Sequence, residues 1–414
     1  MLTCNLRMTS ATFGRLSFHT FAGTLSLKLH RQIESGPPQR FSVPPFRLDQ
    51  LDKKDTTILK GLAILAILFH NFFHVIPEVH VHENEFDFDP ARFPEFLHAV
   101  VHPSLTIQAL FSFFGHYGVQ VFIFLSAYGL AKSHWNDGSS WTSFMWSRIK
   151  KFYPMFAAAV VLWAMLVTFS QGTSWFVHDA GPELLMMFAG LTSIIPGMGL
   201  PPIGPWWFMP FIMQFYAIWP ILRKLTKRFG WHGLLVLAII GLLVTQGTRA
   251  ALMPYGIRLT ETPLGRMRIL CFGIFAAHYP IRITQKMAAL AVLLVIFGNV
   301  YFPLFPLASI SAAVFAVWAY TNLRNSLRNS RFLEVMGNYS LSIFLLNGIV
   351  RAPFIRFAST PARQVLMAVI SFVITVGFSV LLQEFAPSET PHKAPAREQA
   401  RQSPAIRSGI ESAV

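Results

Sequence analysis

The sequence predicts an all-α fold, a polytopic transmembrane helical bundle of about ten spans with one further re-entrant segment. Hydrophobic residues make up 53% of the 414 residues. Charged residues make up only 13% of the chain, whereas about 25% is usual for a soluble domain. Mean hydropathy is +0.47, and several apolar runs approach the roughly 20 residues that cross the hydrocarbon core of a bilayer.

The apolar segments follow one another along most of the chain. They lie near 58–77, 107–131, 152–171, 183–200, 206–222, 233–252, 264–281, 287–302, 304–321, 338–354 and 365–383. Residues 1–50 contain no continuous apolar core before a small-residue cleavage site, so we expect a poorly ordered extension there. Residues 51–383 are predicted to form a single membrane domain. The tail 384–414, rich in Pro, Ala, Arg and Ser, is predicted to be disordered.

The distribution of charge indicates the sides of the membrane. The net charge of +15 comes in short basic clusters between apolar segments, which is typical of cytoplasmic loops and does not indicate nucleic-acid binding. Lys53 and Lys54 precede the first span, and the loop after the second span carries Lys132 and Lys150. The acidic loop between these spans faces outward. We therefore expect an integral protein of the cell (inner) membrane with both termini in the cytoplasm.

The segment 183–200 decides the number of spans. If it crosses fully, the cluster from Arg223 to Arg228 falls outside, and if it is re-entrant or interfacial the cluster stays inside. Its tail, IIPGMGLPPIGP, is rich in glycine and proline, which suits irregular backbone lining a cavity. We therefore favour ten full spans, a model that leaves Arg351, Arg356 and Arg363 outside.

The first span carries ionisable residues within the membrane. Lys60 lies near its start, His70 at mid-depth and His74 one turn later on the same face. With about 1.5 Å rise per residue, Lys60 and His70 are about 15 Å apart along the axis. Such residues are costly in hydrocarbon and are functional candidates by default. The structural alternative for His70 is a hydrogen bond to another helix.

Several separated motifs occur in a fixed order. They are KGLA leading to His70, GVQVFIFLSAY from Gly118, RIKKFYP from Arg148, WWF from Trp206 with QFY and Pro220 following, and GNYS from Gly337 with IFL following. Over roughly residues 50–383 this order and spacing resemble the integral-membrane acyltransferase-3 family. Members of that family O-acylate cell-envelope carbohydrates such as lipopolysaccharide, exopolysaccharide and peptidoglycan.

The chain departs from the family pattern at several positions. Nine residues separate Lys60 from His70, whereas the family has ten between its basic residue and its histidine, so Asn71 occupies the usual register. Some members have histidine at both positions, and His70 can still serve. Ala127 replaces the glycine after the serine, and Asn347 stands where a histidine is common.

The resemblance implies transfer of an acyl group, most often acetyl, from acyl-CoA to a carbohydrate hydroxyl. Acetyl-CoA or another acyl-CoA is then a donor substrate, and no bound cofactor is expected. Histidine suits a general base near neutral pH, so His70 is the expected base, with His74 orienting or replacing it. An alternative is a covalent acyl-enzyme with Ser126 as nucleophile.

The donor is expected to contact basic and aromatic residues. Lys60, Arg148 and Lys151 could bind the phosphates of coenzyme A, although snorkelling and topogenic charge also explain them. Trp207 and Tyr216 offer faces for a carbohydrate or the adenine ring, or belong to an interfacial aromatic belt. Gln214 could bind substrate or link helices.

The expected partners are acyl-CoA, a lipid-linked or nascent polysaccharide, and membrane lipid, with no nucleic acid. No spacing is diagnostic of a metal site, although His80 and His82 in the acidic outer loop could bind a divalent cation. The competing interpretation is a transporter or flippase of a lipid-linked saccharide, because histidines and broken helices at mid-membrane also occur in transporters.

Overall fold

The computed structural model describes residues 46–79, 81–198 and 201–385, and these residues form helices and connecting segments without any strand. The predictions for the terminal extension up to residue 45 and for the tail from residue 386 lie outside the described residues. Residues 46–50, which we assigned to the extension, contain a short 3₁₀ turn, Leu48–Gln50. The hydroxyl of Tyr128 donates hydrogen bonds to the carbonyls of Leu48 and Leu51, so this turn packs on the membrane domain.

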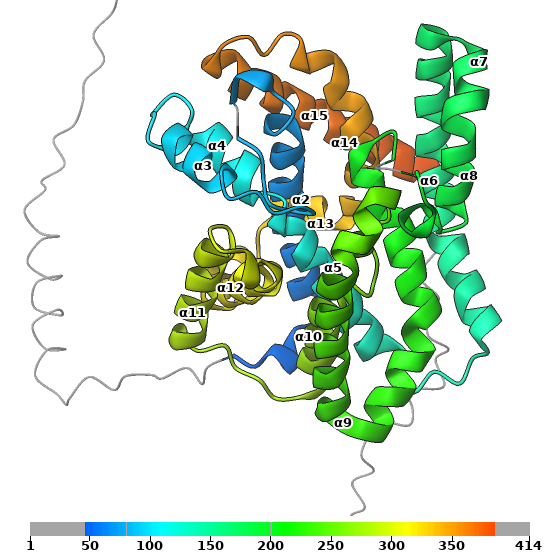
Figure 1. Cartoon of the computed structure of the whole chain (residues 1–414), viewed down its shortest axis with the longest axis vertical. Coiled ribbons are helices and arrows are strands. Elements are labelled where there is room, and N and C mark those ends of the chain that lie inside the picture. The colour runs from blue at the N-terminus through cyan, green and yellow to red at the C-terminus, as the bar shows by residue number, and fades with distance from the viewer. Residues whose placement is uncertain (1–45, 80, 199–200, 386–414) are drawn as a thin grey trace, which may run out of the picture. The chain divides into compact units, whose positions relative to one another are not determined.

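The helices follow the apolar segments of the sequence. They are α2 (Lys53–Phe73), α3 (Arg92–Val100), α4 (Thr106–Phe114), α5 (Tyr117–Ser133), α6 (Trp141–Gln171), α7 (Thr173–Trp175), α8 (Gly181–Phe188), α9 (Phe208–Leu252), α10 (Met267–His278), α11 (Gln285–Gly298), α12 (Phe305–Leu327), α13 (Arg331–Asn338), α14 (Ser340–Ile355) and α15 (Pro361–Phe385). Figure 1 shows this bundle, in which α11 and α12 pack side by side. The predicted all-helical class is confirmed.

The predicted count of about ten spans is not confirmed. Six helical stretches within the described residues are long and apolar enough to cross a membrane, and a seventh results if α13 and α14 count as one span bent by 76°. The segments expected at 264–281 and 287–302 form α10 and α11, with 12 and 14 residues. Helices of this length fall short of the roughly 20 residues that span hydrocarbon.

The segments predicted at 206–222 and 233–252 lie in the two halves of α9. The halves meet at Gly230, whose backbone has φ 60° and ψ −148°. Glycine tolerates this conformation because it has no Cβ. Figure 1 shows α9 doubling back on itself, so one continuous helical stretch supplies two antiparallel arms.

The segment 183–200 contains no membrane-length helix among its described residues. The eight-residue α8 ends at Phe188, and a 3₁₀ turn, Thr192–Ile194, follows it. The side-chain amide of Gln214 in α9 donates to the Gly190 carbonyl (2.7 Å) and the Ser193 hydroxyl (3.0 Å). Irregular backbone of this kind is tolerated at membrane depth only where protein or a cavity satisfies it.

The N-terminus of α2 is fixed by a buried ionic cluster. Asp52 and Asp55 form a capping box that satisfies the first backbone N–H groups of the helix. The Asp55 carboxylate is fully buried and accepts hydrogen bonds from Tyr320 (2.7 Å) and from Nε of Arg324 (2.8 Å). Tyr320 and Arg324 belong to α12, so the cluster joins the first helix to one far along the chain.

A break between α4 and α5 lies beside the C-terminal half of α2. Gly115 sits at this break, and a Cβ added there would meet the His70 Cβ at 2.6 Å. Gly118, in the first turn of α5, is equally close to the backbone of α2: its added Cβ would meet the Ala63 carbonyl oxygen at 2.6 Å. Small residues at both positions therefore allow the break to approach the histidine face of α2 closely.

Candidate active site

His70 lies in the last turn of α2, and His74, the residue that caps the end of α2, continues the same face. They are four residues apart, which places side chains one above the other on a helix. Their rings stack with centroids 4.9 Å apart and an interplanar angle of 19°. His70 is buried, whereas the side chain of His74 is 30% exposed. The pair therefore extends from the packed interior toward a more accessible end.

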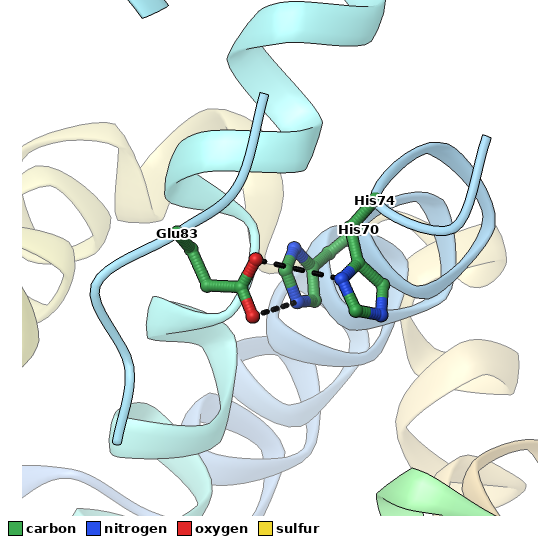
Figure 2. A group of neighbouring side chains, drawn as sticks. All are labelled: His70, His74 and Glu83. Carbon is green, nitrogen blue, oxygen red and sulfur yellow. Dashed lines mark ion pairs between the residues drawn. The ribbon is translucent and has the colours of Figure 1, made fainter. Parts of the chain in front are cut away.

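Glu83 completes a three-residue cluster with these histidines. It lies in the loop that follows α2, and its carboxylate points at both rings in Figure 2. Its Oε1 is 4.0 Å from Nε2 of His70, and its Oε2 is 3.5 Å from Nδ1 of His74. Burial raises the pKa of Glu83, but the contacts with His74 and His70 outweigh burial and hold the pKa well below its usual range. Glu83 is therefore a carboxylate at neutral pH.

The loop that carries Glu83 is anchored on both sides of that residue. The Ser112 hydroxyl donates to the Val81 carbonyl at 2.5 Å. The guanidinium of Arg92 donates to the backbone carbonyls of Glu83 (2.5 Å) and Asp87 (3.1 Å). These bonds fix the backbone of the loop, and they thereby hold the Glu83 carboxylate beside the two histidines.

The hydrogen bonds of His70 determine which ring nitrogen is available. Its Nδ1 lies 2.9 Å from the Ser112 carbonyl oxygen and 3.2 Å from that of Phe111. A carbonyl can only accept, so Nδ1 carries the proton in the neutral ring and Nε2 carries the lone pair. The lone pair is on the side of Glu83. This is the tautomer and orientation that a general base needs.

Asn71 occupies the register in which the family has its histidine. Its backbone carbonyl accepts a hydrogen bond from the Arg351 guanidinium. Its side-chain Nδ2 is buried and has no hydrogen-bond partner among the described residues. His70, not Asn71, contacts Glu83, so the one-residue change in spacing leaves an imidazole at the acidic residue.

His116 is a third histidine at this site, and the sequence motifs did not single it out. Its ring centroid is 5.7 Å from that of His70. It is 1% exposed, and its ring interacts with the backbone of Phe113. Glu83 was also missed as a partner, because nothing in the acidic loop distinguishes it from its neighbours. A histidine between the apolar runs Phe113–Phe114 and Gly118–Leu125 was the available signal for His116.

Other predicted residues gather away from the histidines. Arg148 stacks over the Tyr216 ring at 5.4 Å, and its Nη2 is 2.6 Å from Nε2 of His134. Lys151 is close enough to both Lys60 and His134 for their charges to interact. Lys60, Arg148, Lys151 and Tyr216 thus belong to one basic and aromatic group, ten residues along α2 from His70.

The remaining predicted residues are separated from that group. Ser126 donates to the Phe122 carbonyl of its own helix at 2.8 Å. It is ten residues, or roughly 15 Å along α5, from His116. Gln214 holds the turn after α8. Trp207 lies at the histidine end, where its ring is 5.6 Å from the Arg266 guanidinium and 5.2 Å from the Phe86 ring.

The His70, His74 and Glu83 cluster also has the composition of a metal site. One ligand atom from each residue lies within 4.8 Å of the others. Two imidazoles and a carboxylate suit zinc or another divalent transition metal. The pair expected in the outer loop is different: His80 lies outside the described residues, and His82 is exposed.

Comparison with known proteins gives one family. The family model described as an acyltransferase domain matches residues 54–384, which includes every helix from α2 to α15 apart from single terminal residues. No curated protein and no solved structure matches the chain significantly. The match covers well over half of the sequence and the whole of the candidate site. The chain belongs to the acyltransferase-3 family of membrane proteins, and it is an acyltransferase.

Proposed function

We propose that this protein transfers an acyl group, most often acetyl, from acyl-CoA to a hydroxyl of an envelope or exopolysaccharide sugar. The observation that carries the proposal is the geometry of His70. Its Nδ1 is held by a backbone carbonyl, its Nε2 lone pair is free to accept a proton, and a carboxylate lies 4.0 Å from that nitrogen. A neutral imidazole held through Nδ1, with its Nε2 lone pair available, is the form that a general base requires.

The reaction can be written with these residues. Nε2 of His70 removes the proton from the acceptor hydroxyl as its oxygen attacks the thioester carbonyl carbon. Glu83 stabilises the positive charge that develops on the imidazole, because a buried carboxylate close to the ring acts at low dielectric. The carbon–sulfur bond breaks, and the leaving coenzyme A thiolate recovers the proton from His70. The products are the sugar ester and free coenzyme A.

Direct transfer is preferred over an acyl-enzyme. The Ser126 hydroxyl is bonded to its own helix, and no described histidine, aspartate or glutamate is recorded within hydrogen-bond distance of it. A serine nucleophile needs an adjacent base. The sequence-based alternative is therefore not supported by any contact of Ser126.

The basic and aromatic group is proposed as the donor site. Arg148 offers a guanidinium suited to bidentate contacts with phosphate, and the Tyr216 ring packs against it. Lys60 and Lys151 add positive charge beside them. On the predicted topology this group faces the cytoplasm, where acyl-CoA is found, and the thioester end of the donor would extend toward His70 along α2.

The function is tested with labelled donor. Membranes from a strain lacking the gene, with or without plasmid-borne wild-type protein, would be incubated with acetyl-CoA labelled in the acetyl group. The proposal predicts label in the carbohydrate fraction only when the protein is present. Label that never leaves acetyl-CoA, in a strain whose surface polysaccharide is missing altogether, would favour a flippase instead.

A further inference from the structure

A polar cavity adjoins the histidine cluster and is not used by the mechanism above. It lies between α5, the second half of α9, the segment that leads into α10 and the start of α12, and it is partly open to solvent. Glu85, His116 and Gln120 line one side, and Gln246, Arg266 and Arg268 line the other. His116 links this cavity to the base, because its ring also lies 5.7 Å from that of His70.

The lining contains buried polar atoms that have no hydrogen-bond partner among the described residues. They are Oε1 of Glu85, the side-chain oxygens of Gln120 and Gln246, Nε and Nη2 of Arg266, and Nε and Nη1 of Arg268. His116, Gln120 and Arg266 are each at least 95% buried. Leaving such groups unsatisfied is costly, so their concentration in one cavity indicates a polar ligand.

One arginine of this region has no acidic partner within the described part of the chain. Asp87 pairs with Arg249 at 3.0 Å, Glu261 with Arg258 at 3.5 Å, and Glu85 lies 4.0 Å from Arg266. Arg268 forms no ion pair with any aspartate or glutamate within residues 46–79, 81–198 and 201–385. Arginine is always charged, so an anion beside Arg268 would supply the missing partner.

We propose that this cavity binds an anionic group carried by the acceptor saccharide, a carboxylate or a phosphoryl group on the sugar chain. The arginine N–H groups suit the oxyanion, and the glutamine side chains suit sugar hydroxyls. The assignment rests on the proposed function, since it takes the hydroxyl near His70 to belong to the same saccharide.

The acceptor fits this cavity better than the donor does. The other basic group, Lys60, Arg148 and Lys151, is ten residues away along α2 and already offers cations to coenzyme A. An anion held beside His116 would position the neighbouring sugar at Nε2 of His70. The cavity would thereby select acidic over neutral saccharides.

Binding is measured on the full-length protein in nanodiscs by equilibrium dialysis with labelled glucuronic acid, glucose 1-phosphate and glucose. Wild type is expected to bind at least one anionic sugar roughly tenfold or more tightly than glucose. Arg268→Gln should remove that preference, which corresponds to the loss of one charge-assisted hydrogen bond. Arg356→Gln, an exposed arginine on the same predicted side, should bind like wild type. Equal binding of all three sugars by wild type would overturn the proposal.

Two further measurements are needed. One tests whether the anion in the cavity belongs to the acceptor or to the donor, and the other tests the cavity proposal separately from the proposed function. Coenzyme A binding should be weakened by Arg148→Gln and unchanged in Arg268→Gln, which also shows that the latter variant is folded. The reverse result would assign the cavity to the donor and overturn the acceptor assignment. His70→Gln should retain the preference for anionic sugars while losing acyl transfer. Full transfer by His70→Gln would show that His70 is not the base, and it would not affect the conclusion drawn from the binding measurement.

Discussion

Glu83 and His116, which no sequence motif singled out, lie beside His70 and His74 at the proposed base. His70 and His74 were predicted from their spacing in an apolar run, because a helix places residues four apart on one face. Glu83 could not be predicted as their partner, since the path of the loop after α2 depends on anchors such as Arg92 and Ser112. His116 depends on the break before α5, which brings it to 5.7 Å from His70. Sequence periodicity contains neither piece of information.

The Glu83 carboxylate is expected to matter for turnover more than for donor binding. Glu83→Gln keeps the size of the side chain but removes the charge that stabilises the imidazolium. We expect kcat for acyl transfer to fall by about 10²-fold, within the range for a general base and its supporting group, with little change in KM for acyl-CoA. Steady-state kinetics on isolated membranes would measure both constants. A large rise in KM with kcat unchanged would place Glu83 in donor binding.

The lowered pKa of Glu83 also predicts a pH dependence of stability. A carboxyl group whose pKa is lower in the folded state than its ordinary 4.5 contributes stability that is fully present above that value. This contribution is lost as the pH falls toward the folded-state pKa. The difference in thermal midpoint between wild type and Glu83→Gln should therefore narrow as the pH falls below about 4.5. A difference that widens on acidification would contradict the assigned charge state.

At the scale of helices, close approach of α2 and the α4–α5 break holds His70 in place. Gly115→Ala would put a Cβ 2.6 Å from the His70 Cβ and 2.7 Å from the Ala66 carbonyl oxygen. We expect a destabilisation of about 1–3 kcal/mol together with reduced transfer. Gly129→Ala, in helix α5, would put a Cβ where no atom lies within 4 Å; it is the matched control and should be neutral or slightly stabilising. Thermal unfolding in detergent separates the two, and equal midpoints would show that the packing is looser than described.

The buried Asp55 carboxylate anchors α2 to α12, and this anchoring can be tested by mutation. Asp55→Ala removes the acceptor for Tyr320 and Arg324, and we expect a loss of about 1.5–3 kcal/mol, as for hydrogen bonds to a charged group. Asp49→Ala breaks the pair with Arg47, whose side chain is 37% exposed, and should cost much less. The midpoint of thermal unfolding distinguishes them. A larger loss from Asp49→Ala would show that the surface turn, not the buried cluster, fixes α2.

At the scale of the whole molecule, hydropathy predicted helices but not their lengths. The class follows from composition, because long apolar runs have few alternatives to helix in a bilayer. The span count does not, because α10 and α11 stop after 12 and 14 residues and α9 continues through two predicted segments with a kink at Gly230. The residue at which a helix ends depends on the segments that pack against it in space, and a hydropathy window contains no information about them.

The predicted sidedness is open to a direct test. The basic loops place the α5–α6 connection in the cytoplasm and the loop before α3 outside. In a Cys4→Ser background, Ala91→Cys should react with a membrane-impermeant thiol reagent in intact cells. Ser139→Cys should react only after permeabilisation. Cys271 is buried and provides the unlabelled background. Labelling of Ser139→Cys in intact cells would show that the topology is the opposite of the predicted one. The proposed donor site would then face away from cytoplasmic acyl-CoA.

The central claim is that His70 is the base for acyl transfer. The most direct measurement is the acyl content of the surface carbohydrate, by mass spectrometry, in a null strain complemented with wild type, His70→Gln, His74→Gln or the exposed control His82→Gln. Removal of a general base typically costs about 10²- to 10⁴-fold in rate. We predict that wild type and His82→Gln restore the missing acyl group and that His70→Gln, expressed at the same level, does not. Full restoration by His70→Gln would contradict the account.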